Sequence, residues 1–349
     1  MKYWLIAPEY PLGGAERQMF ELAKSNKDSF QLIDLKSADK NRIIDGVNII
    51  GLGTDVLHLN TKNKVIRRFK RYFSFYSLLI KLKKERAGTV VFYNPIFFLL
   101  AYFLKKNTDI KVVFSMREYK PSLFKFLNLY ILKKIDLIYT NTPRVKAKLN
   151  ELGVNCDLIL NTINVENTQQ TLTRNKNEIF VVSNLEPHKA IHILLYATQN
   201  MSLTINIAGR LSNPDYYNYC QSIAKTSSCT INFLGAIPQE SLRAYLIKSS
   251  CLVHPSILEG TSNAILDAIG TSTPLLVSDI PENSYLVDDL DCFTFRANNT
   301  EELKLKLSTL LKNSEETETL NKLELLRARL NIKFSTNNLA QITRLLNDD

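Results

Sequence analysis

The stretch CLVHPSILEGTSNAILDA, residues 251–268, decides the fold of this chain. Residues 251–254 have the apolar character of a buried parallel strand, and a helix is predicted to begin near Asn263. Glu259 lies in the loop between them, and Asp267 lies about two helical turns further along. A strand, a loop and a helix in this order form one α/β unit, in which ligands bind beyond the carboxyl end of the strand.

The polar groups of this stretch suit a ligand with hydroxyl and phosphate groups. Carboxylates such as those of Glu259 and Asp267 accept paired hydrogen bonds from sugar and ribose hydroxyls. The start of the helix contributes Gly260, Thr261, Ser262 and Asn263. Their backbone N–H groups are placed where a diphosphate would bind. A capped helix start with an incidental acid is the alternative that the stretch alone leaves open.

Short β-rich runs alternate with helical stretches along the chain, as in parallel sheets covered by helices. The predicted strands are 4–7, 89–93, 111–115, 137–140, 179–183, 203–208, 230–234, 251–254 and 274–278, with a first helix over 15–24. The polar stretch 165–177 predicts a linker. The sequence therefore predicts two Rossmann-like α/β domains with parallel sheets, residues 1–165 and 166–349. The second ends in Leu/Lys/Glu-rich helices.

Two further loops follow predicted strands. Gly13 and Gly14 join the first strand to its helix, and glycine permits a tight turn and close approach to a ligand. Lys189 follows strand 179–183, at the end of the strand where such sheets bind ligands, and its ammonium group suits a phosphate. An ordinary turn and a solvated surface lysine are the alternatives.

The composition excludes several classes of protein. Five cysteines without C-x-x-C spacing argue against a disulfide scaffold and are typical of a reducing cytoplasm. The four histidines show no metal-ligand spacing, so we expect neither a metal nor another cofactor. The N-terminus lacks the features of a signal peptide, and the longest apolar run, 95–104, is about half the length that crosses a bilayer. We expect a cytoplasmic protein.

The positive charge is confined to the first half of the chain. Residues 1–165 hold 28 Lys/Arg and 14 Asp/Glu, whereas residues 166–349 hold 16 and 20. In residues 61–86, ten Lys/Arg alternate with aromatic and apolar residues, which is typical of a helix at a membrane interface. This predicts peripheral attachment to an anionic membrane, with an ordinary amphipathic helix as the alternative. Nucleic acid is not expected, because none of its binding motifs is present.

Together, the three loops resemble those of glycosyltransferase family 4, whose members have the GT-B fold of two facing Rossmann-like domains with a cleft between them. The opening P-x-x-G-G-x-E is matched by Pro8, Gly13, Gly14 and Glu16. The family's R-x-x-x-x-K-G loop is partly matched around Lys189, and its P-S-x-x-E-G…E-A signature is matched over 255–268. The resemblance covers about residues 3–290.

The resemblance implies a role for each matched residue. Gly14 approaches the donor diphosphate and Lys189 neutralises it. Glu259 binds the donor sugar, Asp267 the ribose, and the loop at Gly235 lies near the base. Glu259 and Lys189 are the implied catalytic pair, and the mechanism is a front-face reaction with retention that needs positioning and charge stabilisation but no general base. The implied acceptor side contains Glu16, Arg117 and Glu118.

The sequence departs from the family at several positions. Asn184 stands where an arginine is usual, and Ala190 and Ser272 replace glycines. Asp267 is one methylene shorter than the usual glutamate. A histidine that is usual on the acceptor side is absent, and Arg117 in that region either supplies the lost donor charge or binds a phosphate on the acceptor.

The sequence thus predicts a retaining glycosyltransferase that uses a nucleotide-sugar donor and a saccharide or lipid-linked acceptor. The expected setting is the inner face of the plasma membrane, in bacterial surface glycan synthesis: lipopolysaccharide, O-antigen or capsule. A nucleotide-sugar epimerase of the same fold is one alternative. A weak or inactive partner subunit is another, because of the changes at Asn184 and Asp267.

Overall fold

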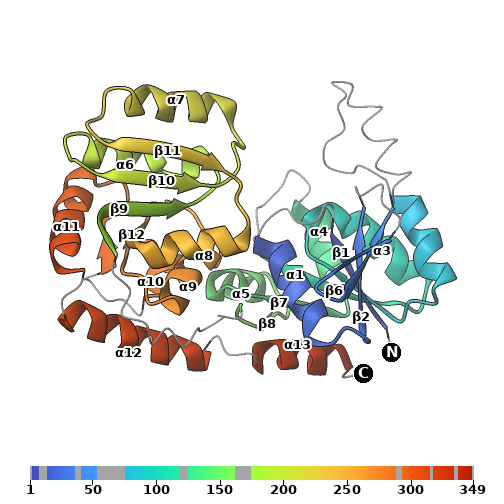
Figure 1. Cartoon of the computed structure of the whole chain (residues 1–349). Coiled ribbons are helices and arrows are strands. Elements are labelled where there is room, and N and C mark those ends of the chain that lie inside the picture. Colours follow the sequence, from blue (N-terminus) through green and yellow to red (C-terminus); the bar gives the residue numbers. More distant parts are fainter. Residues whose placement is uncertain are drawn as a thin grey trace. The chain divides into compact units, whose positions relative to one another are not determined.

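The chain divides into two compact units in a computed structural model that describes residues 2–7, 14–35, 41–52, 75–117, 125–161, 174–287, 293–314, 317–333 and 337–347. Unit 1 comprises Met1–Thr162 together with Thr336–Asp349, and unit 2 comprises Ile163–Ser335. Each unit has its own sheet and its own hydrophobic core, as the alternation of strands and helices predicts (Figure 1).

The strands of unit 1 are β1 (Tyr3–Ala7), β2 (Phe30–Asp34), β3 (Asn41–Ile44), β4 (Val47–Gly51), β5 (Thr89–Phe92), β6 (Lys111–Met116), β7 (Leu137–Thr140) and β8 (Asp157–Leu158). They form one sheet in the order β3-β4-β2-β1-β5-β6-β7-β8. All pairings are parallel except that of β3 with β4. The strand order reverses direction between β1 and β5, which is where sheets of this kind bind their ligands.

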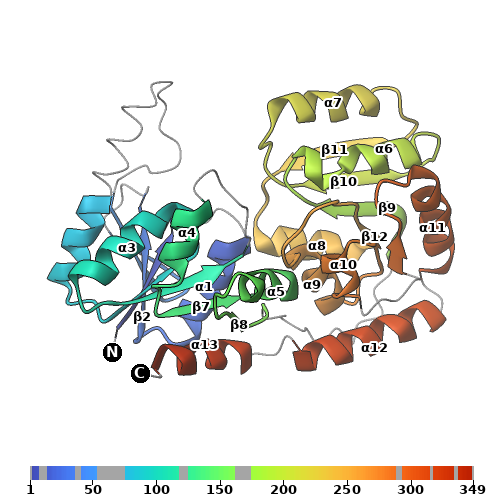
Figure 2. The same cartoon turned by 180° about the vertical axis from the view of Figure 1, so that it is seen from behind.

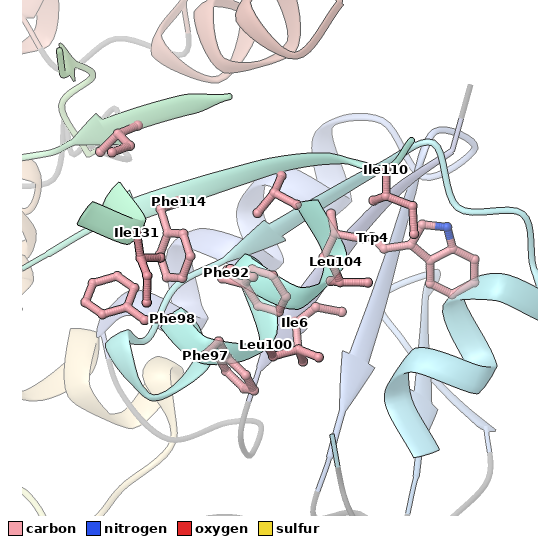
Figure 3. Packing of buried hydrophobic residues seen from close by; sticks show 14 of the residues in the cluster. Trp4, Ile6, Phe92, Phe97, Phe98, Leu100, Leu104, Ile110, Phe114 and Ile131 are labelled. Carbon is pink, nitrogen blue, oxygen red and sulfur yellow. The ribbon is translucent and has the colours of Figure 1, made fainter. Parts of the chain in front are cut away.

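The described helices of unit 1 are α1 (Gly14–Ser25), residues 75–84, η1 (Pro95–Phe97), α3 (Phe98–Asn107), α4 (Lys125–Leu132), α5 (Pro143–Glu151) and α13 (Asn337–Asn347). Apolar residues of 75–84, α3, α4 and α5 pack in one core cluster. Figure 3 shows its centre, where Phe92 stacks on Phe97 with ring centroids 5.0 Å apart and Phe98 contacts Phe114. Apolar residues of α1 and α13 pack in a second cluster, on the other face of the sheet.

Unit 2 has six parallel strands, β9 (Asn175–Val182), β10 (Thr204–Ala208), β11 (Thr230–Gly235), β12 (Ser249–His254), β13 (Leu275–Ser278) and β14 (Thr294–Phe295). Their order is β11-β10-β9-β12-β13-β14, so the direction reverses between β9 and β12. Figure 2 shows the same sheet from behind.

The described helices of unit 2 are η2 (Pro187–Lys189), α6 (Ile191–Thr198), α7 (Pro214–Ala224), α8 (Gln239–Lys248), α9 (Asn263–Gly270), α10 (Pro281–Ser284), α11 (Thr300–Asn313) and α12 (Thr317–Lys333). Apolar residues of α6, α7 and α11 pack together on one face of the sheet. On the other face, Tyr245 of α8 stacks on Phe180 of β9 with centroids 5.1 Å apart.

The domain limits differ from the prediction at both ends of unit 2. The predicted linker, 165–177, lies largely outside the described residues, but β9 already begins at Asn175. Arg174 donates to the carbonyl oxygens of Ile247 and Ser272, at 3.0 and 2.7 Å, so this end of the stretch is part of unit 2.

The last helix also belongs elsewhere than predicted. Ile342 and Leu346 of α13 are buried with Tyr3 and Phe30 of the unit 1 sheet, so the chain returns to unit 1 after α12. The apolar spacing of α13 identifies a buried face in the sequence but not the sheet that covers it.

The helix over 75–84 lies at the end of the basic segment 61–86, of which 61–74 falls outside the described residues. Phe75, Leu78 and Leu82 are buried in the unit 1 core, whereas Tyr76 and Ile80 are exposed. This part of the segment therefore fits the amphipathic-helix alternative, because most of its apolar stripe faces the protein.

Candidate functional site

The loops after β9 and β12 meet at the point where the strand order of unit 2 reverses. Lys189, at the end of η2, places its Nζ 2.6 Å from Oε1 of Glu259, seventy residues further on. The same two loops are also joined by a backbone hydrogen bond, which the N–H of Ile257 donates to the carbonyl oxygen of His188 at 2.9 Å. The structure thus brings together the two residues that the sequence names as the catalytic pair.

His254 is a third member of this cluster. It is the last residue of β12, is almost fully buried, and its Nε2 lies 2.9 Å from Glu259 Oε1 and 3.3 Å from Ser256 Oγ. Its Nδ1 is buried without a hydrogen-bond partner in the described part of the chain. Sequence reasoning weighed His254 only as a metal ligand, although its place at the end of the strand beside the P-S-x-x-E-G signature was a usable signal.

These contacts keep Glu259 ionised. Burial alone would raise the pKa of its carboxyl group. The hydrogen bond and charge of His254 and the ammonium group of Lys189 outweigh burial, and they hold the pKa of Glu259 far below its usual range. An ionised carboxylate is an acceptor only, which suits contacts to hydroxyl groups.

The neighbouring loops are joined through Asn184. Its Oδ1 accepts the backbone N–H of Arg210 at 3.1 Å, and Leu185 N–H donates to the Arg210 carbonyl at 2.9 Å. A Cβ on Gly209 would lie 1.9 Å from the carbonyl oxygen of Ser183, so this close approach requires glycine. Asn184, predicted to bind the donor, holds the loop after β10 against the loop after β9.

The helix that follows the signature begins as predicted. Ser262 is the N-cap of α9, and its side chain accepts the Ile265 N–H at 3.4 Å. Asp267 lies in α9, half-buried, and accepts a hydrogen bond from Gln239 of α8 at 3.3 Å. Gly235, at the end of β11, has a φ of +67° and accepts the N–H of Gly209. Gly260, Thr261 and Asn263 lie in or beside the same loop.

Two of the departures from the family pattern have a visible backbone consequence. Ala190, after Lys189, has a φ of +50°, and Ser272, after α9, has a φ of +53°. Side chains other than glycine are disfavoured in this region. At both positions the backbone thus adopts the conformation that favours glycine, the residue that the family pattern has there.

Unit 1 contains a second polar cluster, at the carboxyl ends of β5 to β8. Arg117, just after β6, donates through Nη1 to Asn161 Oδ1 at 2.7 Å, and its guanidinium carbon lies 5.3 Å from the centre of the Tyr93 ring. Tyr139 donates to the Tyr93 hydroxyl at 2.8 Å, and Asn141 Nδ2 donates to Asn161 at 3.0 Å. The sequence names only Arg117 of this group, because tyrosines and asparagines at strand ends carry no distinctive spacing.

The remaining predicted residues of unit 1 lie at the start of α1 or outside the described residues. Gly13 and Glu118 lie outside the described residues, Gly14 is the first residue of α1, and Glu16 lies in α1. No group of three potential metal ligands occurs among the described residues. No described helix has the length and apolar character of a membrane span.

Comparisons with known proteins find similarity over most of the second unit. Residues 164–324 match the family model of the glycosyl transferases, group 1. The O-antigen chain mannosyltransferase RfbU of Salmonella typhimurium is 26% identical over 164 residues, which are 45% of this chain and 46% of that protein. Glycosyltransferase 1 domain-containing protein 1 of Xenopus tropicalis is 44% identical over 61 residues, 18% of each chain. The matches thus span less than half of each of these relatives.

Solved glycosyltransferase structures share the fold of the whole chain. Sucrose-phosphate synthase from Thermosynechococcus elongatus superposes with a TM-score of 0.82 at 14% identity, covering 99% of this chain and 98% of that one. Anabaena HepE in complex with UDP-glucose gives 0.78 at 15% identity, covering 99% of both. The chain therefore has the GT-B fold of two α/β domains with parallel sheets, as predicted. Its narrower assignment to family 4 stays a prediction.

Proposed function

We propose that this chain is a retaining glycosyltransferase that transfers a sugar from a nucleotide-sugar donor. The observation that carries the proposal is the cluster of Lys189, Glu259 and His254 at the strand-order reversal of unit 2. Ligands of open α/β sheets bind at such reversals, and the cluster lies within the segment that matches the group 1 glycosyltransferases.

The chemistry of the cluster suits a sugar diphosphate. An ammonium group has three N–H donors, so the contact of Lys189 with Glu259 leaves two that can bind phosphate oxygens. Glu259 would accept hydrogen bonds from donor hydroxyls, and Asp267 from the ribose. The start of α9 would receive the diphosphate at the positive end of its dipole. In this scheme the protein positions the reactants and stabilises developing charge, without a general base or a metal.

The proposed acceptor is a saccharide, lipid-linked in the expected case of surface glycan synthesis. The similarity to RfbU, named as an O-antigen chain mannosyltransferase, supports that setting. The alternatives, an epimerase or an inactive partner subunit, make different predictions: an epimerase needs no acceptor, and a partner subunit binds without turnover.

A panel of nucleotides tests the donor site directly. Purified full-length chain is titrated with UDP, GDP, ADP and CMP, starting with UDP because HepE was solved with UDP and with UDP-glucose. Ligands that bind the native state raise the melting temperature. We expect one nucleotide to stabilise the chain, and NMR of the product to show the anomeric configuration of the donor. Absence of binding at millimolar concentration would favour the inactive partner.

Unit 1 is proposed to contact an anionic membrane, from the cytoplasmic side. Phe103 of α3 and Leu127 and Tyr130 of α4 are about half exposed. Lys105 and Lys106 lie in the last turn of α3, and Lys133 and Lys134 follow α4. The ammonium group of Lys134 lies 5.9 Å from the centre of the Tyr130 ring. Exposed apolar side chains bordered by cations are typical of surfaces that rest on anionic lipid.

Vesicle sedimentation tests the membrane contact. We expect the chain to bind phosphatidylglycerol vesicles and not phosphatidylcholine vesicles at low salt. Replacing Lys133 and Lys134 with Glu should weaken binding, since each cation near an anionic surface contributes about 1 kcal/mol. The same exchange at Lys225 and Lys248, two exposed lysines of unit 2, is the matched control. Equal binding to both lipids would contradict the proposal.

A further inference from the structure

The carboxyl edge of the unit 1 sheet holds a cation whose counter-charge is missing from the described residues. Arg117 is half-buried, and the groups that it contacts among the described residues are neutral: the amide oxygen of Asn161 and the side chain of Tyr93. Its Nε is buried and makes no hydrogen bond within the described residues. Removing a charge from water without an opposite charge is costly, so a half-buried guanidinium of this kind suits a site that an anion completes.

The surroundings hold this guanidinium in place. The guanidinium carbon lies 5.3 Å from the centre of the Tyr93 ring, within the range of a cation–π contact, and the hydrogen bond to Asn161 fixes the direction of the group. Asn161 is itself held by Asn141, which donates to the same oxygen. A guanidinium has five N–H donors in a rigid fork that matches the oxygens of phosphate and carboxylate. The cluster is therefore arranged before any ligand binds.

Tyr93 supplies a second donor to the same place. It is almost fully buried, and its oxygen accepts the hydroxyl proton of Tyr139. Burial raises the pKa of Tyr93 well above its ordinary value, and the nearby Arg117 does not reverse this, so the hydroxyl keeps its proton. Since its oxygen already accepts from Tyr139, the Tyr93 proton is available to donate to a further acceptor.

The position of the cluster is that of a ligand site. Tyr93 directly follows β5, which borders the reversal between β1 and β5, and Arg117 follows the next strand, β6. This is the edge at which open α/β sheets bind ligands.

We propose that Arg117 and Tyr93 form an oxyanion site for a phosphoryl or carboxylate group carried by the acceptor. Asn161, Asn141 and Tyr139 are its positioning residues. The proposal deepens the proposed function and rests on it for the identity of the acceptor, because a negatively charged acceptor is a narrower class than a saccharide. The two sources of the charge, a phosphate ester and an acidic sugar, share the same recognition chemistry.

Side-chain NMR of the full-length chain tests the site. The Nε–Hε signal of Arg117, identified by its loss in Arg117→Lys, is followed during titration with methyl phosphate and with methyl glucuronide, and methyl glucoside serves as the uncharged control. We expect one or both anions to shift the signal with saturation and the glucoside to leave it unchanged. A shift by phosphate alone indicates a phosphorylated acceptor, and a shift by glucuronide alone indicates an acidic sugar.

Substitutions test whether the anion binds at this edge of the sheet. Arg117→Gln should weaken binding of the active probe about tenfold or more, since hydrogen bonds to charged groups are the strong ones. Tyr93→Phe keeps the ring and should weaken it by a smaller factor. Arg117→Lys should retain part of the affinity. Lys225→Gln should leave binding of the probe unchanged, because Lys225 is an exposed lysine of unit 2 with no part in either proposed site.

Several results would overturn the inference: no shift by either anion, unchanged affinity in Arg117→Gln, or an equal loss of probe binding in Lys225→Gln. Nucleotide binding, measured in the same variants, separates this failure from failure of the proposed function. If Arg117→Gln lost nucleotide binding while keeping its melting temperature, the arginine would belong to the donor site instead. If no nucleotide bound the wild type while methyl phosphate still shifted the Arg117 signal, the donor proposal would fail and the oxyanion site would stand.

Discussion

The carboxyl edges of the two sheets differ in whether their cation is paired with a carboxylate. In unit 2, Lys189 forms an ion pair with Glu259 at 2.6 Å. His254 contacts the same carboxylate oxygen at 2.9 Å. In unit 1, Arg117 contacts an amide and an aromatic ring, and it forms no ion pair with a carboxylate of the described residues. One edge pairs its cation with a carboxylate, and the other holds its cation among neutral groups.

This difference indicates what each edge can bind. A balanced edge suits a ligand with both hydroxyl and phosphate groups, because the carboxylate accepts and the ammonium donates. An edge that holds a cation among neutral groups suits an anion. The same fold, used twice, therefore separates two kinds of recognition, and the predictions below test that separation.

The largest effect is expected at Glu259. Glu259→Gln keeps the shape of the side chain but removes the charge that both Lys189 and His254 contact. Loss of one charge-stabilising group in an active site lowers turnover by about 10²–10³-fold, and we expect a decrease of that order in sugar transfer. The measurement is the initial rate at saturating donor, with the melting temperature as a check of folding. Full activity in a folded variant would remove Glu259 from the catalytic site.

A smaller effect is expected on donor affinity at Lys189. Lys189→Gln should weaken binding of the nucleotide diphosphate about tenfold to a hundredfold, the range for hydrogen bonds to charged groups. Calorimetric titration of wild type and variant measures it. Lys225→Gln, at an exposed lysine of the same unit, should bind as the wild type does. If both variants weakened binding equally, net charge and not the Lys189 contact would be responsible.

The contrast also shows what the sequence can predict. The loop-and-helix pattern of 251–268 predicted β12, the helix that follows it and the place of Glu259 in the loop between them, because these depend on local spacing. The alternation of apolar runs predicted the parallel sheets for the same reason. Partners separated in the chain were harder: Asn161 lies forty-four residues from Arg117, and only the fold brings them together.

The sequence pattern did not predict the short strands or the unit to which the last helix belongs, and there is a physical reason for each. Strand β3 has no buried residue, and β8 and β14 have two residues each. For α13, the apolar face predicts burial, but unit 1 and unit 2 offer chemically similar surfaces. Its assignment depends on tertiary packing that local propensity does not encode.

The acid dependence of stability should distinguish the two edges. Because the pKa of Glu259 is lowered on folding, its ionised form stabilises the native state above the ordinary pKa of glutamate, about 4.3, and this contribution is lost as pH falls below that value towards the folded pKa. Urea unfolding of wild type and Glu259→Gln should therefore differ most near neutral pH and converge as pH falls below about 4. A constant difference from pH 7 to pH 3 would contradict the ionised cluster.

The same experiment in Arg117→Gln provides the comparison from unit 1. Arg117 remains charged throughout this range, and the described residues give it no carboxylate partner. We expect the difference in unfolding free energy between wild type and Arg117→Gln to stay constant over the same pH range. A difference that changed with pH would indicate an acidic partner in the protein and would weaken the case for an external anion.

The smallest effects are expected at the two residues with positive φ. Ala190→Gly relieves backbone strain of about 1 kcal/mol but loses the burial of a methyl group, worth about 0.8 kcal/mol, so stability should change little. Ser272→Gly relieves similar strain but also removes hydrogen bonds to Glu324 and Arg327, at 2.7 and 2.9 Å. We therefore expect Ser272→Gly to be the less stable of the two by about 1 kcal/mol.

Urea unfolding with two probes measures this difference within unit 2. Circular dichroism follows the whole chain, whereas the fluorescence of Trp4, the single tryptophan, follows unit 1. Ser272→Gly should lower the dichroism transition, Ala190→Gly should leave it nearly unchanged, and neither should move the Trp4 transition. If Ala190→Gly were instead strongly destabilising, the methyl group would be holding the Lys189 loop in shape, and nucleotide affinity should fall with it. If Ala190→Gly raised nucleotide affinity at unchanged stability, the strained loop would be limiting the donor site, and the departure from the family pattern would be a functional one.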